Sequence, residues 1–152
     1  MDSGLTGLKE ASSAFISATA ESSENSRIGV ATFNAYGNNL SNLVNARDNK
    51  NSLKQTIASI YAAGGTSPQK GLSIAQTNLA NSKRTDVPQY VILFTDGAPS
   101  EDTDKNDSKE IARQLRESGI TVYTVGLKLN DETSNWLSEN ICLLYTSPSP
   151  RD

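Results

Sequence analysis

The sequence predicts a single α/β domain in which helices cover both faces of a mostly parallel sheet. Helical and strand-like patterns alternate along the chain at spacings typical of crossover connections. Residues 90–94 form five consecutive apolar positions, as expected of a strand covered by helices on both faces. The length of 152 residues suits one domain with one hydrophobic core. These three observations predict an α/β sandwich with parallel strands.

The N-terminal part of the chain predicts a helix, a strand and a weak edge strand. Apolar residues recur at steps of three and four within residues 5–18, which indicates a surface helix that should fade in the polar run 21–26. The β-branched segment 27–33 predicts a mostly buried strand. Residues 36–44 are rich in Asn and Gly and predict at best a short edge strand.

Two helical patterns follow in the middle of the chain. Apolar residues within 53–60 mark the first, and the glycine pair at 64–65 is expected to end it. The second carries Leu72, Ala75 and Leu79 on its inner face. The apolar strand 90–94 comes next and is expected to be central or next to central in the sheet.

The C-terminal part predicts one more strand between two helices. Apolar residues within 111–115 indicate a helix that Gly119 closes. Residues 120–125 predict the next strand. A last helix is expected over residues 131–141, where Trp136 and Leu137 are interpreted as core residues.

Composition excludes several kinds of chemistry. The chain contains no His, so it has no Ser-His-Asp or Cys-His pair and no His-bearing metal site. One Cys allows neither an internal disulfide nor a thiolate metal cage. With 14 basic and 17 acidic residues the chain lacks the positive field of nucleic-acid binders, and no apolar run is long enough for a membrane span. A metal site would therefore use oxygen ligands, which suits Mg²⁺, Ca²⁺ or Mn²⁺.

The tripeptide Thr95-Asp96-Gly97 directly follows the apolar strand. Ligands of open α/β sheets bind at the carboxyl ends of the strands, so Asp96 is expected to point into the site. The alternative is that Asp-Gly simply forms a turn. Both interpretations remain open for this segment taken alone.

The segment 64–71 is rich in glycine and precedes a helix. Thr66 with Gln69 fits a capping box, and Pro68 suits the first helical turn. A phosphate-binding loop is excluded because it needs Gly-Lys followed by Ser or Thr, whereas here Lys70 precedes Gly71. The functional alternative is a hydroxyl group presented to a cation at a helix N-terminus.

A third candidate is the acidic run 101–107. An EF-hand loop beginning at Asp102 would need Gly in place of Asp107 and Glu in place of Arg113, so the calcium template fails at two positions. We interpret the run as a solvated acidic loop.

Taken together, these segments resemble the von Willebrand factor A domain family, with details most similar to bacterial members. The resemblance rests on the strand 27–33, a Gly-Gly-Thr sequence that opens a helix, an apolar strand ending in Thr-Asp-Gly, and the segment Gly-Ile-Thr-Val-Tyr-Thr-Val-Gly at 119–126. It covers nearly all of residues 1–141. It implies a three-layer α/β/α, Rossmann-like fold.

The resemblance also implies a function. Domains of this family carry a metal-ion-dependent adhesion site in which Mg²⁺ or Mn²⁺, more than Ca²⁺, sits at the top of the sheet. By similarity, Thr66 and Asp96 would hold the metal, and Gly65, Ser67 and Gly97 would lie at the ligand-binding surface. A protein ligand would contribute a carboxylate to the open coordination position. We therefore expect a non-catalytic protein-interaction module.

The chain departs from the family pattern at its ends. No intact Asp-x-Ser-x-Ser motif is present and no strand precedes the first helix. Residues 1–141 are therefore expected to be a partial domain that lacks the first, central strand and the last strand. Loss of a central strand exposes backbone groups and an apolar face, so we expect this chain alone not to be a stable, metal-competent domain. Residues 142–152 resemble translated sequencing adapter and are interpreted as a non-native tail.

Other functions remain as alternatives. A phosphoacceptor receiver would use Asp96 with Lys128, but its essential hydroxyl residue should follow the aspartate, whereas Thr66 precedes it. A von Willebrand factor A subunit of a metal-chelatase-type machine is a second alternative. A two-metal hydrolase is disfavoured because few acidic residues lie near strand ends. No signal-peptide pattern is present, and the sequence assigns no compartment.

Overall fold

The computed structural model describes residues 3–61, 66–82, 84, 86–95, 99, 101–126 and 129–141. Within these residues, helices and strands follow one another in an order close to that predicted. The elements are α1 (Ser3–Ser22), β1 (Arg27–Phe33), β2 (Gly37–Asn45), α2 (Lys50–Ala58), α3 (Pro68–Asn81), β3 (Tyr90–Thr95), α4 (Asp102–Glu117), β4 (Thr121–Gly126) and α5 (Asp131–Asn140).

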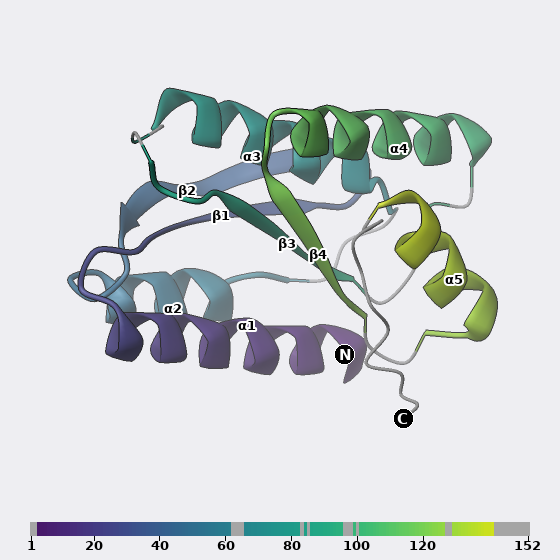
Figure 1. Cartoon of the computed structure of the whole chain (residues 1–152). Coiled ribbons are helices and arrows are strands. Elements are labelled where there is room, and N and C mark those ends of the chain that lie inside the picture. Colours follow the sequence, from purple (N-terminus) through teal and green to yellow (C-terminus); the bar gives the residue numbers. More distant parts are fainter. Residues whose placement is uncertain are drawn as a thin grey trace.

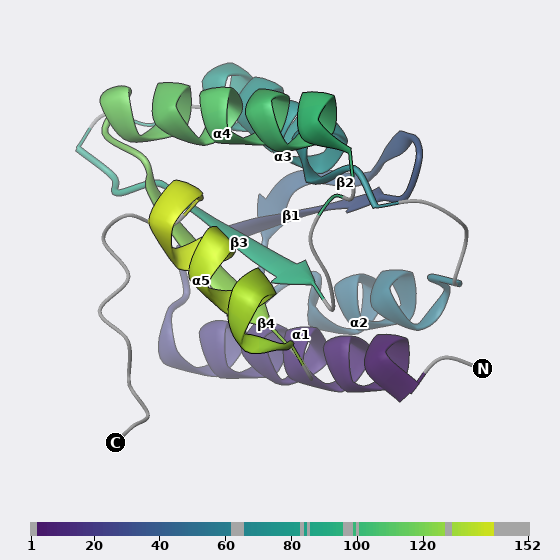
Figure 2. The same ribbon diagram turned by 90° about the vertical axis from the view of Figure 1, so that its right-hand side faces the viewer.

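The elements form three layers. Helices α3 and α4 lie above the strands, α1 and α2 lie below them, and α5 lies beside β4 (Figures 1 and 2). The predicted α/β/α arrangement is therefore confirmed. No helix among the described residues is both long and apolar enough to cross a bilayer.

The strand layer differs from the expected single, mostly parallel sheet. It consists of two separate two-stranded sheets, β1–β2 and β3–β4. The first pair is antiparallel and the second is parallel. In both views the strands follow one another in the order β2, β1, β3, β4 (Figures 1 and 2). The separation between β1 and β3 lies where the sequence analysis expected a central strand to be missing.

Most of the buried apolar side chains lie between the strands and the upper helices. We call this cluster the upper core; it joins α3, α4 and α5 to the β3–β4 sheet. Successive side chains of β3 point to opposite faces of the sheet, and Val91 and Leu93 lie on the face that is buried in the upper core. Its buried members are Leu72, Leu79, Val91, Leu93, Ala112, Leu115, Ile120, Val122, Leu137 and Ile141.

A smaller cluster, the lower core, joins α1 and α2 to the β1–β2 sheet. Its buried members are Ile16, Leu53 and Ile57. The strand residues that contact it, such as Ile28 and Val30, are only partly buried. The lower layer is therefore packed on far fewer buried side chains than the upper layer.

Helix α3 connects the two halves of the strand layer. It packs against β1 and β2 on one side and against β3 and α4 on the other. At Gly71 an added Cβ atom would lie 2.9 Å from Cδ1 of Phe33 in β1. This glycine therefore allows the helix to approach β1 closely.

Several predicted boundaries need correction. The segment expected to be at best a short edge strand is the nine-residue strand β2, because antiparallel hydrogen bonds to β1 stabilise it despite its many Asn residues. Helix α2 ends at Ala58, before the glycine pair at 64–65, which lies outside the described residues. Strand β4 begins one residue later than predicted. The β1 bounds are confirmed, as is the closing role of Gly119, whose φ is +85°.

Candidate functional site

The candidate site lies at the edge of the strand layer where β3 ends. The N-terminal ends of α3 and α4 lie on this same side of the molecule (Figure 1). Parallel α/β units bind ligands at the carboxyl ends of their strands. The last residue of β3, Thr95, is buried at this edge.

The start of α3 carries two of the predicted site residues, Thr66 and Ser67. Ser67 occupies the N-cap position and is only 3% exposed, and Pro68 follows at the first helical position. The Ser67 side chain makes no capping hydrogen bond. The capping-box interpretation of Thr66 with Gln69 is therefore wrong, because the cap lies one residue further along the chain.

The Ser67 hydroxyl group contacts α4 instead. Its Oγ donates a hydrogen bond to Oδ1 of Asp104 at 3.1 Å. Asp104 lies in the first turn of α4, together with Asp102. The sequence analysis missed this contact, because 37 residues separate the two side chains and no local pattern connects them.

The acidic run that we interpreted as a solvated loop is mostly helical. Glu101 is the N-cap of α4, and Asp102, Asp104 and Asp107 lie within the helix. Carboxylates in a first helical turn are stabilised by the helix dipole, which explains why an acidic sequence begins a helix here. Asp104 is half-buried and Asp102 and Asp107 are exposed.

The other predicted site residues cannot be placed beside Thr66. Gly65, Asp96 and Gly97 lie outside the described residues, as does Lys128 of the receiver alternative. The convergence of Thr66 and Asp96 on one cation therefore stays a prediction. Among the described residues, β3 ends at Thr95 and contacts α3.

The donor groups at this edge are of the chemical type that hard cations bind. Thr66 and Ser67 offer hydroxyl oxygens and Asp104 a carboxylate, and the chain contains no His. Oxygen donors of this type suit Mg²⁺ and Mn²⁺. Within the part of the chain that the structure describes, no three Asp, Glu, His or Cys residues are grouped as a metal site.

Two buried hydroxyl groups have no hydrogen-bond partner among the described residues: Ser108 Oγ in α4 and Thr124 Oγ1 in β4. Ser108 lies one helical turn after Asp104. An unpaired buried hydroxyl normally costs free energy, so these positions are not optimised for packing alone.

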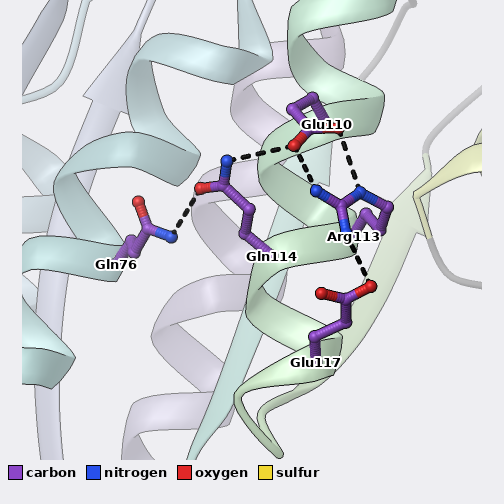
Figure 3. Close-up of polar contacts among 5 residues, drawn as sticks. All are labelled: Gln76, Glu110, Arg113, Gln114 and Glu117. Carbon is purple, nitrogen blue, oxygen red and sulfur yellow. Dashed lines mark hydrogen bonds and ion pairs between the residues drawn. The ribbon is translucent and has the colours of Figure 1, made fainter.

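A polar network lies on the outer face of α4 (Figure 3). Arg113 pairs with Glu110 and with Glu117, and Gln114 connects Glu110 to Gln76 of α3. The hydrogen bond from Arg113 lowers the pKa of Glu110 to about 2. The hydrogen bond from Glu110 in turn raises the pKa of Arg113. These side chains are about half exposed, so the network is a surface feature and not part of the candidate site.

The predicted core role of the C-terminal helix is confirmed. Leu137 of α5 is buried in the upper core and Trp136 packs against it while remaining partly exposed.

Comparisons with known proteins agree with this architecture. The family profile of the von Willebrand factor type A domain matches residues 1–142. The mouse (Mus musculus) collagen alpha-4(VI) chain is 34% identical over 76 residues, a match that covers 47% of this chain and 3% of the collagen chain.

Solved structures also share the fold. Proximal thread matrix protein 1 from the mussel byssus has a TM-score of 0.69 at 19% identity, covering 91% of this chain and 35% of that one. A second structure of this mussel protein has a zinc-occupied MIDAS motif, with a TM-score of 0.61 at 19% identity and coverages of 88% and 34%. Manganese-loaded TRAP protein from Plasmodium vivax has a TM-score of 0.59 at 22% identity, with coverages of 79% and 51%. This chain thus spans about half or less of each of these proteins.

Proposed function

The chain belongs to the von Willebrand factor type A domain family, and from this premise we propose that it is a non-catalytic, adhesion-type module. The module binds an acidic protein ligand through a divalent metal ion. The match to a collagen VI chain and the MIDAS motif named for the mussel protein support an interaction module over an enzyme.

The placement of Thr66 and Ser67 carries this proposal. Both lie at the start of α3, at the strand edge where β3 ends one residue before Asp96. A hydroxyl group and a carboxylate from these two segments supply the hard oxygen donors that a cation of this kind requires.

In the proposed site Thr66 and Asp96 hold Mg²⁺ or Mn²⁺, and Ca²⁺ is disfavoured. The similar mussel structure contains zinc and the Plasmodium structure contains manganese, which supports a divalent cation in general. The carboxylate of the protein ligand completes the coordination, and Gly65 and Gly97 line the surface that receives it. Binding is therefore abolished by a chelator. Ser67, expected at that surface from the sequence, is instead buried with its hydroxyl group on Asp104.

We also propose that residues 1–141 are a partial domain. Among the described residues, β1 pairs only with β2 and β3 only with β4, which leaves the edges between them without strand partners. Unpaired backbone groups inside a layered fold are costly, and a strand between β1 and β3 would satisfy them. We use the term "extended domain" for residues 1–141 preceded by the strand that this proposal requires between β1 and β3.

Calorimetric titration with Mg²⁺ and Mn²⁺ tests the function. We expect the extended domain to bind the metal, and the 152-residue chain to bind it much more weakly. In the extended domain, Asp96→Ala should abolish binding and Thr66→Ala should weaken it. Thr56→Ala, which removes a hydroxyl group from α2 in the opposite layer, is the matched control and should leave the affinity unchanged.

An Asp96→Ala variant with unchanged metal affinity would remove the proposed site. Binding of an acidic ligand that persists in excess chelator would show that the module does not act through a metal. Either result would leave the family and the fold intact.

A further inference from the structure

We propose that Asp104 of α4 is a positioning residue for the metal-binding loop. Its carboxylate holds the Ser67 hydroxyl group and thereby orients the neighbouring Thr66. This inference rests on the function proposed above, since Thr66 matters only if it holds the metal.

The first argument is the direction of the Ser67 side chain. A serine at an N-cap position usually accepts a hydrogen bond from a backbone N–H of the first helical turn. Here the N-cap serine makes no such bond and donates to Asp104 Oδ1 at 3.1 Å. Ser67 is almost completely buried, so Asp104 is the hydrogen-bond partner that satisfies its hydroxyl group in place of the helix backbone.

The second argument is the neighbourhood of Ser67. Thr66 is its immediate predecessor, and Pro68 with its restricted φ is its successor. Pro68 restricts the backbone of Ser67, and Asp104 holds its side chain. The residue that follows Thr66 is therefore fixed on the start of α3, which limits where the Thr66 hydroxyl group can lie.

The third argument is the location of Asp104. It lies in the first turn of the helix that follows Asp96 along the chain. Its bond to Ser67 therefore joins the start of α4 to the start of α3, where Thr66 precedes the helix.

Mg²⁺ titration of variants in the extended domain tests this role. Ser67→Ala and Asp104→Ala should each weaken Mg²⁺ binding by roughly tenfold, the usual effect of losing an outer-shell partner. Ser67→Thr, which keeps the hydroxyl group, should restore most of the affinity. Asp104→Asn keeps an acceptor oxygen but loses the charge, so it should weaken binding less than Asp104→Ala and more than Asp107→Asn, which lies on the exposed face of the same helix.

A double-mutant cycle distinguishes positioning from direct coordination. If Ser67 acts through Thr66, adding Ser67→Ala to Thr66→Ala should cause no further loss of Mg²⁺ affinity. A second readout needs no metal: hydrogen exchange of the Lys70 amide, which donates to the Ser67 carbonyl oxygen, should speed up in Ser67→Ala and Asp104→Ala but not in Asp107→Asn.

Each outcome decides a different point. Unchanged Mg²⁺ affinity in Ser67→Ala and Asp104→Ala overturns the inference while the proposed function stands. Additive losses in the Thr66 and Ser67 cycle also overturn it, because they would show that Ser67 contacts the metal itself. An extended domain that binds no Mg²⁺ overturns the proposed function, and this inference with it.

Discussion

The upper and lower halves of the molecule are built from the same kinds of element but are packed very differently. The upper core buries apolar residues from α3, α4, α5, β3 and β4, whereas the lower core buries only Ile16, Leu53 and Ile57. The two faces of the β3–β4 sheet show the same contrast. Its upper face is buried, while on its other face Tyr90 and Tyr123 stack on each other and are 52% and 48% exposed.

This difference shows what a layered fold requires. Each sheet must cover both faces and pair both edges to satisfy its apolar side chains and its backbone groups. Helix α3 covers both sheets from above, but among the described residues no strand joins β1 to β3, and the lower layer covers β3–β4 poorly. The upper half therefore carries most of the stabilising packing.

The largest expected effect comes from equivalent truncations in the two cores. Leu115 of α4 and Leu53 of α2 are both almost completely buried. In the extended domain, Leu115→Ala should lower the free energy of unfolding by about 3–5 kcal/mol, and Leu53→Ala by about 2–3 kcal/mol, because fewer buried groups surround Leu53. Urea unfolding measures both. Equal losses would show that the lower core is as well packed as the upper.

A smaller effect is expected at the sheet edges. In the 152-residue chain, backbone amides of β3 that bond to β4 should exchange with solvent more slowly than the β1 and β3 amides that face the gap between the sheets, by roughly a hundredfold. Hydrogen exchange followed by NMR measures this ratio. In the extended domain the edge amides should become protected. Equal protection of both sets in the 152-residue chain would contradict the separation of the two sheets.

The smallest effect is expected from the surface network on α4. Measuring it shows how much surface charge, as opposed to core packing, stabilises the upper half. Glu110 has a pKa lowered from 4.5 to about 2, chiefly by its hydrogen bond from Arg113. A lowered carboxyl pKa contributes stability that is present above pH 4.5 and is lost as pH falls through about 2. Because the pair is exposed to solvent, the change in stability should be slight.

NMR titration of the Glu110 carboxyl group checks this value. Arg113→Ala should return the pKa of Glu110 toward 4.5, whereas Lys109→Ala on the same helix serves as the control. A Glu110 carboxyl that already titrates near 4.5 in the unaltered chain would rule out the pairing in solution. A large loss of stability in Arg113→Ala would show that surface charge contributes more to the upper half than its core does.

Local patterns predicted the elements whose side chains repeat regularly. The steps of three and four in α1 and the apolar run of β3 are local patterns, so the sequence alone predicts these elements. The expected burial of β3 on both faces was wrong, because only the face of Val91 and Leu93 is fully buried. Strand β2 was underestimated because its Asn-rich sequence has little intrinsic preference for a strand. The length of β2 depends on backbone hydrogen bonds to β1, and the residue types of β2 do not predict that pairing.

The candidate site likewise has a part that the sequence predicts and a part that depends on tertiary packing. Thr66, Ser67 and the position of Asp96 after a strand follow from the order of residues along the chain. The partner of Ser67 does not, because Asp104 is 37 residues away and only the packing of α4 against α3 brings it near. In this packing the N-cap of α3 is Ser67, and its hydroxyl group makes no hydrogen bond to the helix backbone.

The sequence by itself determined the alternation of helices and strands, the absence of histidine and thiolate chemistry, and the positions of the hydroxyl and carboxylate groups at segment ends. Each of these depends on residue type and local spacing. Only the tertiary structure decided that the strands form two separate pairs, that the core lies mainly on one side, and that Asp104 holds Ser67. Those features arise from contacts between residues far apart in the chain, whose formation depends on which backbone edges and apolar faces find partners in the folded protein.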